Sequence, residues 1–146
     1  MQFTLPMDSE AIMKCIPHRD PFVMIDSVIE MEPRAKIVTI KKAKHLHEFL
    51  RGHFPGNPIV PGVLIVEGIA QSAAVLTSIS YHDSHPVSCF LTEISSARFR
   101  KIVGINDELR YEVLQTNFRK PFLWFEAKAF VGEEIAAIVK LSAQMK

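Results

Sequence analysis

One stretch of the chain predicts a helix that is hydrophobic on every side. It runs from residue 62 to residue 80, contains alanine and leucine, and lacks proline. Its apolar residues, spread around the whole helix, are Val63, Leu64, Ile65, Val66, Ile69, Ala70, Ala73, Ala74, Val75 and Leu76. A helix with this pattern belongs in a hydrophobic core, so we expect other elements to surround it.

The segments on both sides of this helix are rich in valine and isoleucine, which is typical of strands. A short helix over residues 9–16, capped by Asp8 or Ser9 and stopped by Pro17, comes first. The predicted strands cover residues 22–31, 35–43, 87–94, 96–103, 107–117, 122–131 and 136–145. We expect the C-terminal strands to form an antiparallel meander. The whole chain, residues 1–146, is then one α+β domain in which a single sheet curls around the central helix.

Composition narrows the classes of function. The chain has 146 residues, 48% of them hydrophobic, and a net charge of +1, so no overall basic field favours nucleic acid. Cys15 and Cys89 form no CxxC pair, which fits a reducing, cytoplasmic protein without a zinc site. The N-terminus lacks a basic stretch followed by an apolar core. The apolar run from residue 59 to residue 70 is interrupted and too short to span a bilayer, so we expect neither export nor membrane insertion.

The segment before the central helix is a stiff loop. Its sequence, HFPGNPIVPG over residues 53–62, holds three prolines and two glycines. Such a loop presents the backbone N–H groups of Gly62 and Val63, which belong to the first helical turn and have no helical acceptor. These donors suit a carbonyl oxygen that gains negative charge during a reaction.

A carboxyl group lies about two turns into the apolar helix. Burying ionised Glu67 without a partner would cost several kcal/mol, so it is expected to be protonated or paired. Burial would make it a candidate general acid, Gln71 could hydrogen-bond it from the next turn, and His53 is the natural base. Alternatively, Glu67 is a structural ion-pair member and His53 is structural as well. An acid, a base and backbone donors together favour proton transfer beside a carbonyl.

The sequence GHFPGNPIVPGVLIVEGIAQ, residues 52–71, resembles the signature of the beta-hydroxyacyl-acyl carrier protein dehydratases of fatty-acid synthesis. The likeness extends to IPHRDPFVMIDSVIEMEP upstream and SARFRKIV downstream. Glutamate at position 67 is similar to the dehydrase-only branch, because the bifunctional dehydratase-isomerases carry aspartate there. The resemblance implies a hotdog fold, no metal and no organic cofactor. It also implies homodimers, or hexamers built as trimers of dimers, with tunnels that combine His53 of one subunit and Glu67 of the other.

The resemblance also implies a mechanism. His53 would remove the C2 proton of a (3R)-3-hydroxyacyl chain on the phosphopantetheine of an acyl carrier protein, and Glu67 would protonate or orient the departing C3 hydroxyl. The amide of Gly62 would bond the thioester carbonyl, and water and a trans-2-enoyl thioester would result. A cis peptide between His53 and Phe54 is expected by the same likeness. His18, in the PHRDPF segment, is expected to be structural and near the subunit contact, and not the base.

Two further groups of residues are candidates for binding. Arg98, Arg100 and Lys101 could dock the acidic carrier protein or its phosphate, although solvated strand charges are the alternative; alternation places the two arginines on one face. The candidates for lining an acyl tunnel, or else for ordinary core, are Phe54, Val63, Ile65, Phe90, Leu91 and Phe99.

Some features leave alternatives open. RKIVGINDEL, residues 100–109, departs from the family pattern RRPVVPGDQL. We expect the chemistry to survive this departure, whereas tunnel depth, gating and carrier preference are left open. The histidines at 45–47 and 82–85 lack a third ligand at a recognisable spacing, so we expect exposed loop or strand-end residues. The rival functions are a dehydratase of a polyketide-like or polyene pathway, a thioesterase on the same fold, and a non-catalytic acyl-binding hotdog protein.

Overall fold

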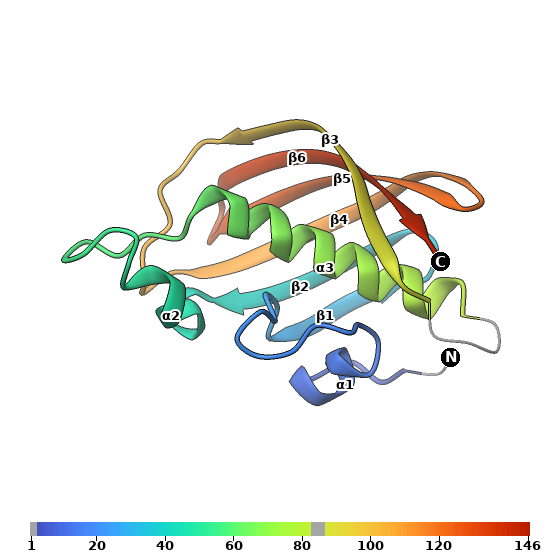
Figure 1. Cartoon of the computed structure of the whole chain (residues 1–146), viewed down its shortest axis with the longest axis horizontal. Coiled ribbons are helices and arrows are strands. Elements are labelled where there is room, and N and C mark those ends of the chain that lie inside the picture. Colours follow the sequence, from blue (N-terminus) through green and yellow to red (C-terminus); the bar gives the residue numbers. More distant parts are fainter. Residues whose placement is uncertain (1–2, 83–86) are drawn as a thin grey trace.

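The computed structural model describes residues 3–82 and 87–146, and shows a curved antiparallel sheet with one long helix lying in its concave face (Figure 1). The short helix α1 lies beside the end of the sheet that β1 forms (Figure 1). In chain order the elements are α1 (Ser9–Met13), β1 (Ser27–Glu32), β2 (Lys36–Lys42), a 3-10 turn (Ala43–Leu46), α2 (His47–Leu50), α3 (Gly62–Ser80), β3 (Cys89–Phe99), β4 (Glu108–Arg119), β5 (Phe122–Val131) and β6 (Glu134–Met145).

The central helix is confirmed with both of its predicted ends. The first helix is shorter than predicted: it is capped by the Asp8 side chain, which accepts a hydrogen bond from Ala11 N, but it ends at Met13. The first strand begins at Ser27 and not at residue 22, because the backbone of residues 22–24 is hydrogen-bonded by the side chain of Gln71 instead of by a strand. The two strands predicted at 87–94 and 96–103 are one strand, β3, with irregular register after Leu91 and after Ile94.

The predicted C-terminal meander is correct for β4, β5 and β6 and wrong for β3. The strand order is β1-β2-β4-β5-β6-β3, so β3 lies at the edge beside β6. Because β4 already pairs with β2 on one side and with β5 on the other, it has no free edge for β3. The chain returns from β3 to β4 past the start of α3, where Val60 N donates to Val103 O at 2.8 Å.

The segment that departs from the family pattern forms a tight turn on this return path. Gly104 N donates to the carboxylate of Asp107 at 2.8 Å, and Asp107 N donates to Gly104 O at 3.1 Å. The carbonyl of Asp107 also accepts from Ala43 N at 2.9 Å. The GIND sequence is therefore a closed turn that holds the return path against the end of β2.

The sheet covers α3 on all but one stripe. Thirteen of its nineteen residues are buried. By length and composition this helix could cross a membrane, but 72% of its apolar window is buried inside the protein, so its hydrophobicity is explained by the core. The stripe that the chain itself leaves partly open is formed by Val63, Glu67 and Ala70, which lie on one helical face. Val63 is 74% exposed.

One glycine lets α3 approach the sheet closely. A Cβ atom on Gly68 would lie 2.7 Å from two ring carbons and from the phenol oxygen of Tyr111 on β4. Tyr111 is 1% exposed and surrounded by core, so its ring has no space to move. Burial, together with the nearby charge of Asp26, raises the pKa of the Tyr111 phenol, which therefore stays neutral.

We expect Gly68→Ala to lower the free energy of unfolding by about 1–3 kcal/mol, even though alanine is the better helix former, because the new methyl group overpacks the contact with Tyr111. Chemical denaturation monitored by circular dichroism measures this change. Gly52→Ala is the matched control, since a Cβ there meets no atom within 4 Å. Equal stability of the two variants would contradict this account of the helix–sheet contact.

Candidate functional site

The carboxyl group of Glu67 lies at a small cavity between α3 and the start of β3. The cavity has a volume of about 160 Å³ and opens beside the partly open stripe of α3. Apart from Glu67 its walls are mostly small or apolar, formed by His18, Ala70, Gln71, Ala73, Ala74, Cys89, Phe90, Leu91, Leu141 and Ala143. Burial raises the pKa of Cys89 to about 11, so its thiol is neutral at physiological pH. Glu67 is therefore a polar group at the edge of an apolar space.

Gln71 holds this carboxyl group, as the sequence predicts. Its Nε2 donates to Glu67 Oε2 at 2.9 Å and to the carbonyl of Phe22 at 2.8 Å, while its Oε1 accepts from Met24 N at 2.8 Å. Only this orientation of the amide gives every one of these groups a matching partner. Because Gln71 is 1% exposed, its bonds fix Glu67 relative to the segment at residues 22–24.

A second polar cluster anchors the same segment to the sheet. Lys41, which is 4% exposed on β2, donates to the carbonyl of Val23 at 2.8 Å and to the carboxylate of Asp26 at 3.1 Å. Asp26 also accepts from Lys42 N at 2.8 Å and contacts His45 Nδ1 at 2.9 Å. This buried lysine is thus paired and hydrogen-bonded, as a buried charge must be.

We expect Gln71→Leu to lower the free energy of unfolding by about 2–4 kcal/mol, because it leaves the N–H of Met24 and the carbonyl of Phe22 without partners. Hydrogen exchange of the Met24 amide provides a local readout, and we expect it to accelerate by at least roughly 10-fold. Gln144→Leu, at a partly exposed position on β6, is the matched control. Unchanged protection of Met24 in Gln71→Leu would refute the role assigned to this amide.

His53 lies in the loop that precedes α3. Its backbone N–H donates to Leu50 O at 2.9 Å, and its backbone carbonyl accepts from Ile59 N at 2.9 Å. Its ring stacks on the ring of Phe54, with the two centroids 4.4 Å apart. The peptide bond between His53 and Phe54 is cis, which confirms that prediction. Nδ1 lies 3.1 Å from the carbonyl of Ile59, which makes Nδ1 the protonated nitrogen and leaves Nε2 with a lone pair. His53 is therefore oriented with a basic nitrogen available.

The start of α3 presents the backbone donors that the sequence predicts. The carbonyl of Pro61 accepts from Leu64 N at 3.0 Å and from Ile65 N at 3.4 Å. In the part of the chain that the structure describes, the N–H groups of Gly62 and Val63 have no such acceptor. A Cβ on Gly62 would lie 2.9 Å from the ring of Phe99, so glycine also lets β3 end against the helix.

Within one chain, His53 does not line the cavity of Glu67. The residue that does lie next to this carboxyl group is His18, whose Nε2 is 3.6 Å from Glu67 Oε2. The sequence predicts a structural role for His18 and misses this contact, because 49 residues separate the two side chains and no local spacing reveals their proximity.

The predicted tunnel residues fall into three groups. Phe90 and Leu91 line the cavity of Glu67, whereas Phe54, Val63 and Phe99 are at least half exposed near the start of α3. Ile65 is 2% exposed and packs in the core of the chain, as the alternative interpretation holds. Sequence reasoning missed the cavity walls formed by Ala70, Ala73, Ala74, Cys89, Leu141 and Ala143. Small residues on one face of the helix were the signal that could have identified part of this wall.

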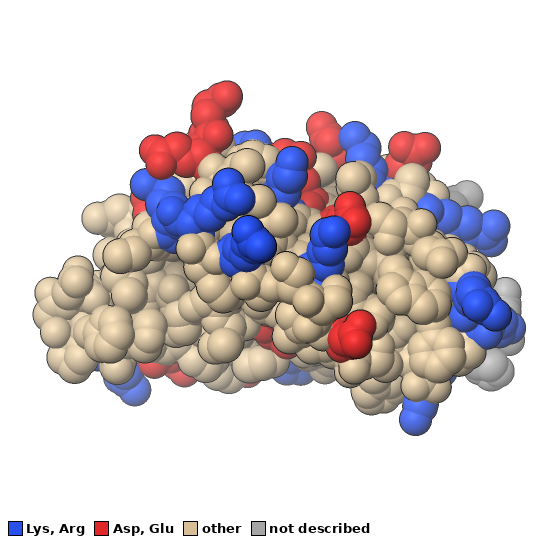
Figure 2. All heavy atoms as spheres, turned by 90° about the horizontal axis from the view of Figure 1, so that it is seen from above, with Lys and Arg blue, Asp and Glu red and all other residues tan. Residues whose placement is uncertain are grey.

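The predicted docking residues lie at the end of β3. Arg98, on β3, and Arg100, directly after the strand, are both exposed, whereas Lys101 pairs with Glu134 at 3.5 Å. Figure 2 shows Lys and Arg side chains gathered on the half of the upper face where β3 ends. Among the described residues, Lys101 forms an ion pair, whereas Arg98 and Arg100 form none. The guanidinium groups of both arginines can therefore contact a partner.

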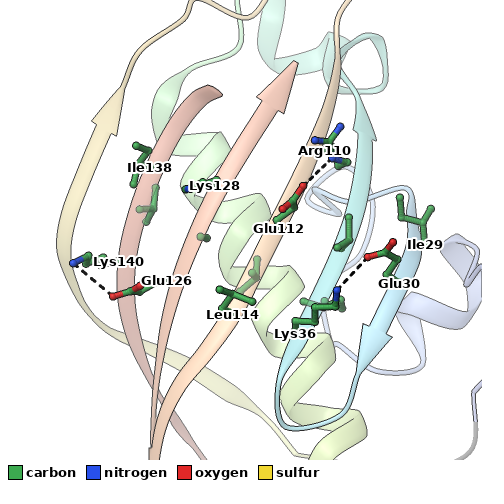
Figure 3. Close-up of a pocket in the computed structure, with 15 residues that line it drawn as sticks. Ile29, Glu30, Lys36, Arg110, Glu112, Leu114, Glu126, Lys128, Ile138 and Lys140 are labelled. Carbon is green, nitrogen blue, oxygen red and sulfur yellow. Dashed lines mark hydrogen bonds and ion pairs between the residues drawn. The ribbon is translucent and has the colours of Figure 1, made fainter. Parts of the chain in front are cut away.

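A larger hollow of about 420 Å³ lies on the face of the sheet that points away from α3 (Figure 3). Its charges are arranged as ion pairs. Lys36 with Glu30 and Lys140 with Glu126, each at 3.6 Å, join neighbouring strands, whereas Arg110 and Glu112 pair at 3.1 Å along β4. Neither His53 nor Glu67 contributes to it. Alternating charges of this kind are typical of the solvated face of an antiparallel sheet, so this hollow is not the reaction site.

The remaining histidines belong to separate surroundings. His45 lies in the 3-10 turn and contacts Asp26, and His47 begins α2. Both are exposed, as expected, but they lie in helical turns and not in a loop or at a strand end. His82 follows α3, and His85 lies outside the described residues. Among residues 3–82 and 87–146, no three histidine, cysteine or acidic side chains gather as a metal site would require.

These elements define the class of the protein. The sheet wrapped around one long helix is a hotdog fold, and the chain matches the model of the FabA-like domain over residues 16–140. The chain therefore belongs to the FabA-like family.

Curated relatives and a solved structure agree with this assignment. The chain is 43% identical over 140 residues to the 3-hydroxyacyl-[acyl-carrier-protein] dehydratase FabZ of Geotalea uraniireducens, covering 94% of this chain and 95% of the relative. It is 34% identical over 142 residues to the FabZ dehydratase of Legionella pneumophila, covering 96% and 95%. The dehydratase heterocomplex ApeI:P of Xenorhabdus doucetiae contains a chain with the same fold, with a TM-score of 0.80 at 16% identity, over 99% of this chain and 93% of that one.

Proposed function

We propose that this protein is a 3-hydroxyacyl-[acyl-carrier-protein] dehydratase of fatty-acid biosynthesis, which converts its substrate into a trans-2-enoyl thioester and water. The observation that carries the proposal is the carboxyl group of Glu67, held by Gln71 at the edge of an apolar cavity in a chain whose relatives bear this name. The mechanism uses only side chains and a backbone amide, so it requires no metal or organic cofactor. We expect the protein to work in the cytoplasm.

An exposed strand edge supports a dimer. β3 pairs with β6 on one side, and its other edge has no partner strand among the described residues. This strand also exposes large apolar side chains: Phe90, Leu91, Ile94 and Phe99 are 45–51% exposed. A long apolar edge strand is a template for pairing with another chain. Two copies of β3 can therefore pair antiparallel around a twofold axis near Ile94, the middle of the strand.

Such pairing completes the site. Phe99, at the end of β3, lies beside Gly62 and the loop of His53, whereas Cys89, Phe90 and Leu91, at the start of β3, line the cavity of Glu67. Antiparallel pairing places the end of one β3 opposite the start of the other. The His53 loop of one protomer then lies next to the Glu67 cavity of its partner, which accounts for the absence of His53 from that cavity within one chain.

The reaction then divides between the two protomers. Nε2 of His53 takes the proton from C2, and the electron pair of that C–H bond forms the C2=C3 double bond. The C3–O bond breaks, and the hydroxyl group leaves as water with the proton of Glu67. The N–H of Gly62 bonds the thioester oxygen as enolate charge develops, which lowers the barrier because this bond is strongest in the transition state. Proton exchange with solvent returns His53 to its neutral form and Glu67 to its acid form.

We expect the purified protein to convert carrier-bound 3-hydroxyacyl chains into products lighter by one water, detected by mass spectrometry. His53→Ala and Glu67→Ala should each reduce kcat by at least roughly 100-fold while retaining the fold, because each removes one proton-transfer group. A panel of short, long and polyunsaturated chains decides between fatty-acid synthesis and a specialised polyene or polyketide-like pathway. Near-normal turnover by either variant would refute its assigned role.

Mixing the two inactive variants tests the shared site. After subunit exchange, half of the dimers are mixed and each mixed dimer holds one intact pair of His53 and Glu67, so about a quarter of the wild-type activity should return. The composition of the dimers can be verified by native mass spectrometry. Mixed dimers that remain inactive would contradict the sharing of the site between protomers.

We further propose that Arg98 and Arg100 dock the carrier protein. We expect the double variant Arg98→Glu, Arg100→Glu to raise KM for carrier-bound substrate by roughly 10-fold or more, since charge reversal opposes an acidic partner. Turnover of the same acyl group on a small pantetheine thioester should change little. Glu126→Arg, Lys140→Glu, which reverses an ion pair on the outer face of the sheet, is the control. Equal losses on both substrates would indicate general damage and not a docking surface.

A further inference from the structure

His18 lies against the carboxyl group of Glu67 and has no part in the mechanism so far. Its Nε2 is 3.6 Å from Glu67 Oε2, and the side chains of both residues are 26% exposed. Its ring stacks on Phe22, with centroids 6.2 Å apart and planes 16° apart, and the carbonyl of Phe22 accepts from Gln71. The bonds that hold Glu67 therefore also hold the segment that carries His18.

The surroundings of His18 select one protonation state. Its Nδ1 is buried and has no hydrogen-bond partner among the described residues. An imidazolium would bury an unpaired N–H at this position, whereas the neutral form protonated at Nε2 leaves only a lone pair unpaired. Nε2 then directs its N–H toward the carboxyl group of Glu67.

Two donors thus approach the same oxygen of Glu67. Gln71 Nε2 donates to Oε2 at 2.9 Å, and His18 Nε2 faces Oε2 at 3.6 Å. The second distance exceeds a hydrogen bond by about 0.5 Å, and such contacts shorten when charge develops at a catalytic group. With Oε2 occupied in this way, Oε1 is the oxygen that can carry the proton to the substrate.

We infer that His18 is a positioning residue, whose Nε2–H stabilises the carboxylate that forms when Glu67 gives its proton to the departing hydroxyl. This inference rests on the proposed dehydratase function. His18 acts on Glu67 and does not touch the reacting atoms.

The other charged and titratable groups near Glu67 do not replace this donor. Cys89 is the other titratable residue among those that line the cavity, and its thiol is neutral. Arg19 directs its guanidinium to the carbonyls of Ile16 at 3.0 Å and His18 at 2.6 Å. In the proposed dimer, His53 of the partner subunit faces Glu67 across the substrate. Removing the side chain of His18 therefore removes one defined donor.

The test compares His18→Leu and His18→Gln in the full protein, with His82→Leu as a histidine control at the opposite end of α3. His18→Leu should lower kcat roughly 10- to 100-fold, the range for losing a hydrogen bond to a charged group, with KM within about 3-fold. His18→Gln keeps an N–H at a similar reach and should stay within about 5-fold of wild type.

The pH profile separates positioning from a merely structural role. At high pH, kcat falls as Glu67 loses the proton that it must donate. Without the donor of His18 the carboxylate is less stable, so the alkaline limb should move to higher pH in His18→Leu and stay in place in His18→Gln and His82→Leu. Unchanged kcat and an unchanged limb in folded His18→Leu would overturn the inference.

If His18→Leu does not fold, His18→Gln decides: near-normal kcat with an unmoved limb supports the inference, and a loss of 10-fold or more overturns it. Wild-type protein that dehydrates no substrate would overturn the proposed function itself. If the wild-type protein is active and the His18 variants have its kcat and its pH profile, only the role of His18 would be overturned.

Discussion

The burial of α3 is the physical constraint on which the rest of this structure depends. This helix has nineteen residues, with apolar side chains on all sides. Leaving its apolar surface in water would cost about 25 cal/mol for each Å², so the chain must cover it. Thirteen of its residues are buried in the fold. The stripe of Val63, Glu67 and Ala70 remains partly open, and the apolar edge of β3 lies beside the same opening. The part of the core that one chain leaves open therefore lies at the candidate site.

Hydrogen bonds place several polar groups inside this core. Gln71 joins Glu67 to the backbone of residues 22–24, and Lys41 joins the same segment to β2. Ser72 on α3 and Thr39 on β2 form a further buried pair at 2.8 Å. Such bonds contribute little net stability but are costly to leave unmade, so they determine where the segment of His18 can lie. The position of the carboxyl group follows from this network as much as from the helix.

The arrangement of one chain explains why two chains are needed for the proposed chemistry. His53 has a rigid backbone setting and an available Nε2, and Glu67 has its own cavity, but the first residue does not line the cavity of the second. A base and an acid that touched in a single chain would neutralise each other. Their separation within a protomer, and their approach across paired β3 edges, leave space between them for the substrate.

The sequence by itself determined the features that depend on neighbouring residues. The ends of α3, the stiff loop before it and the bond between Gln71 and Glu67 follow from helical spacing and from proline and glycine, which act over a few residues. The family motif added the roles expected of His53 and Glu67. The place of β3 at the sheet edge, the core position of Ile65, the alanine-lined cavity and the contact of His18 with Glu67 were decided only by the tertiary structure. Each of these depends on which distant segments pack together, and that choice is made by burial of the whole core and not by any local pattern.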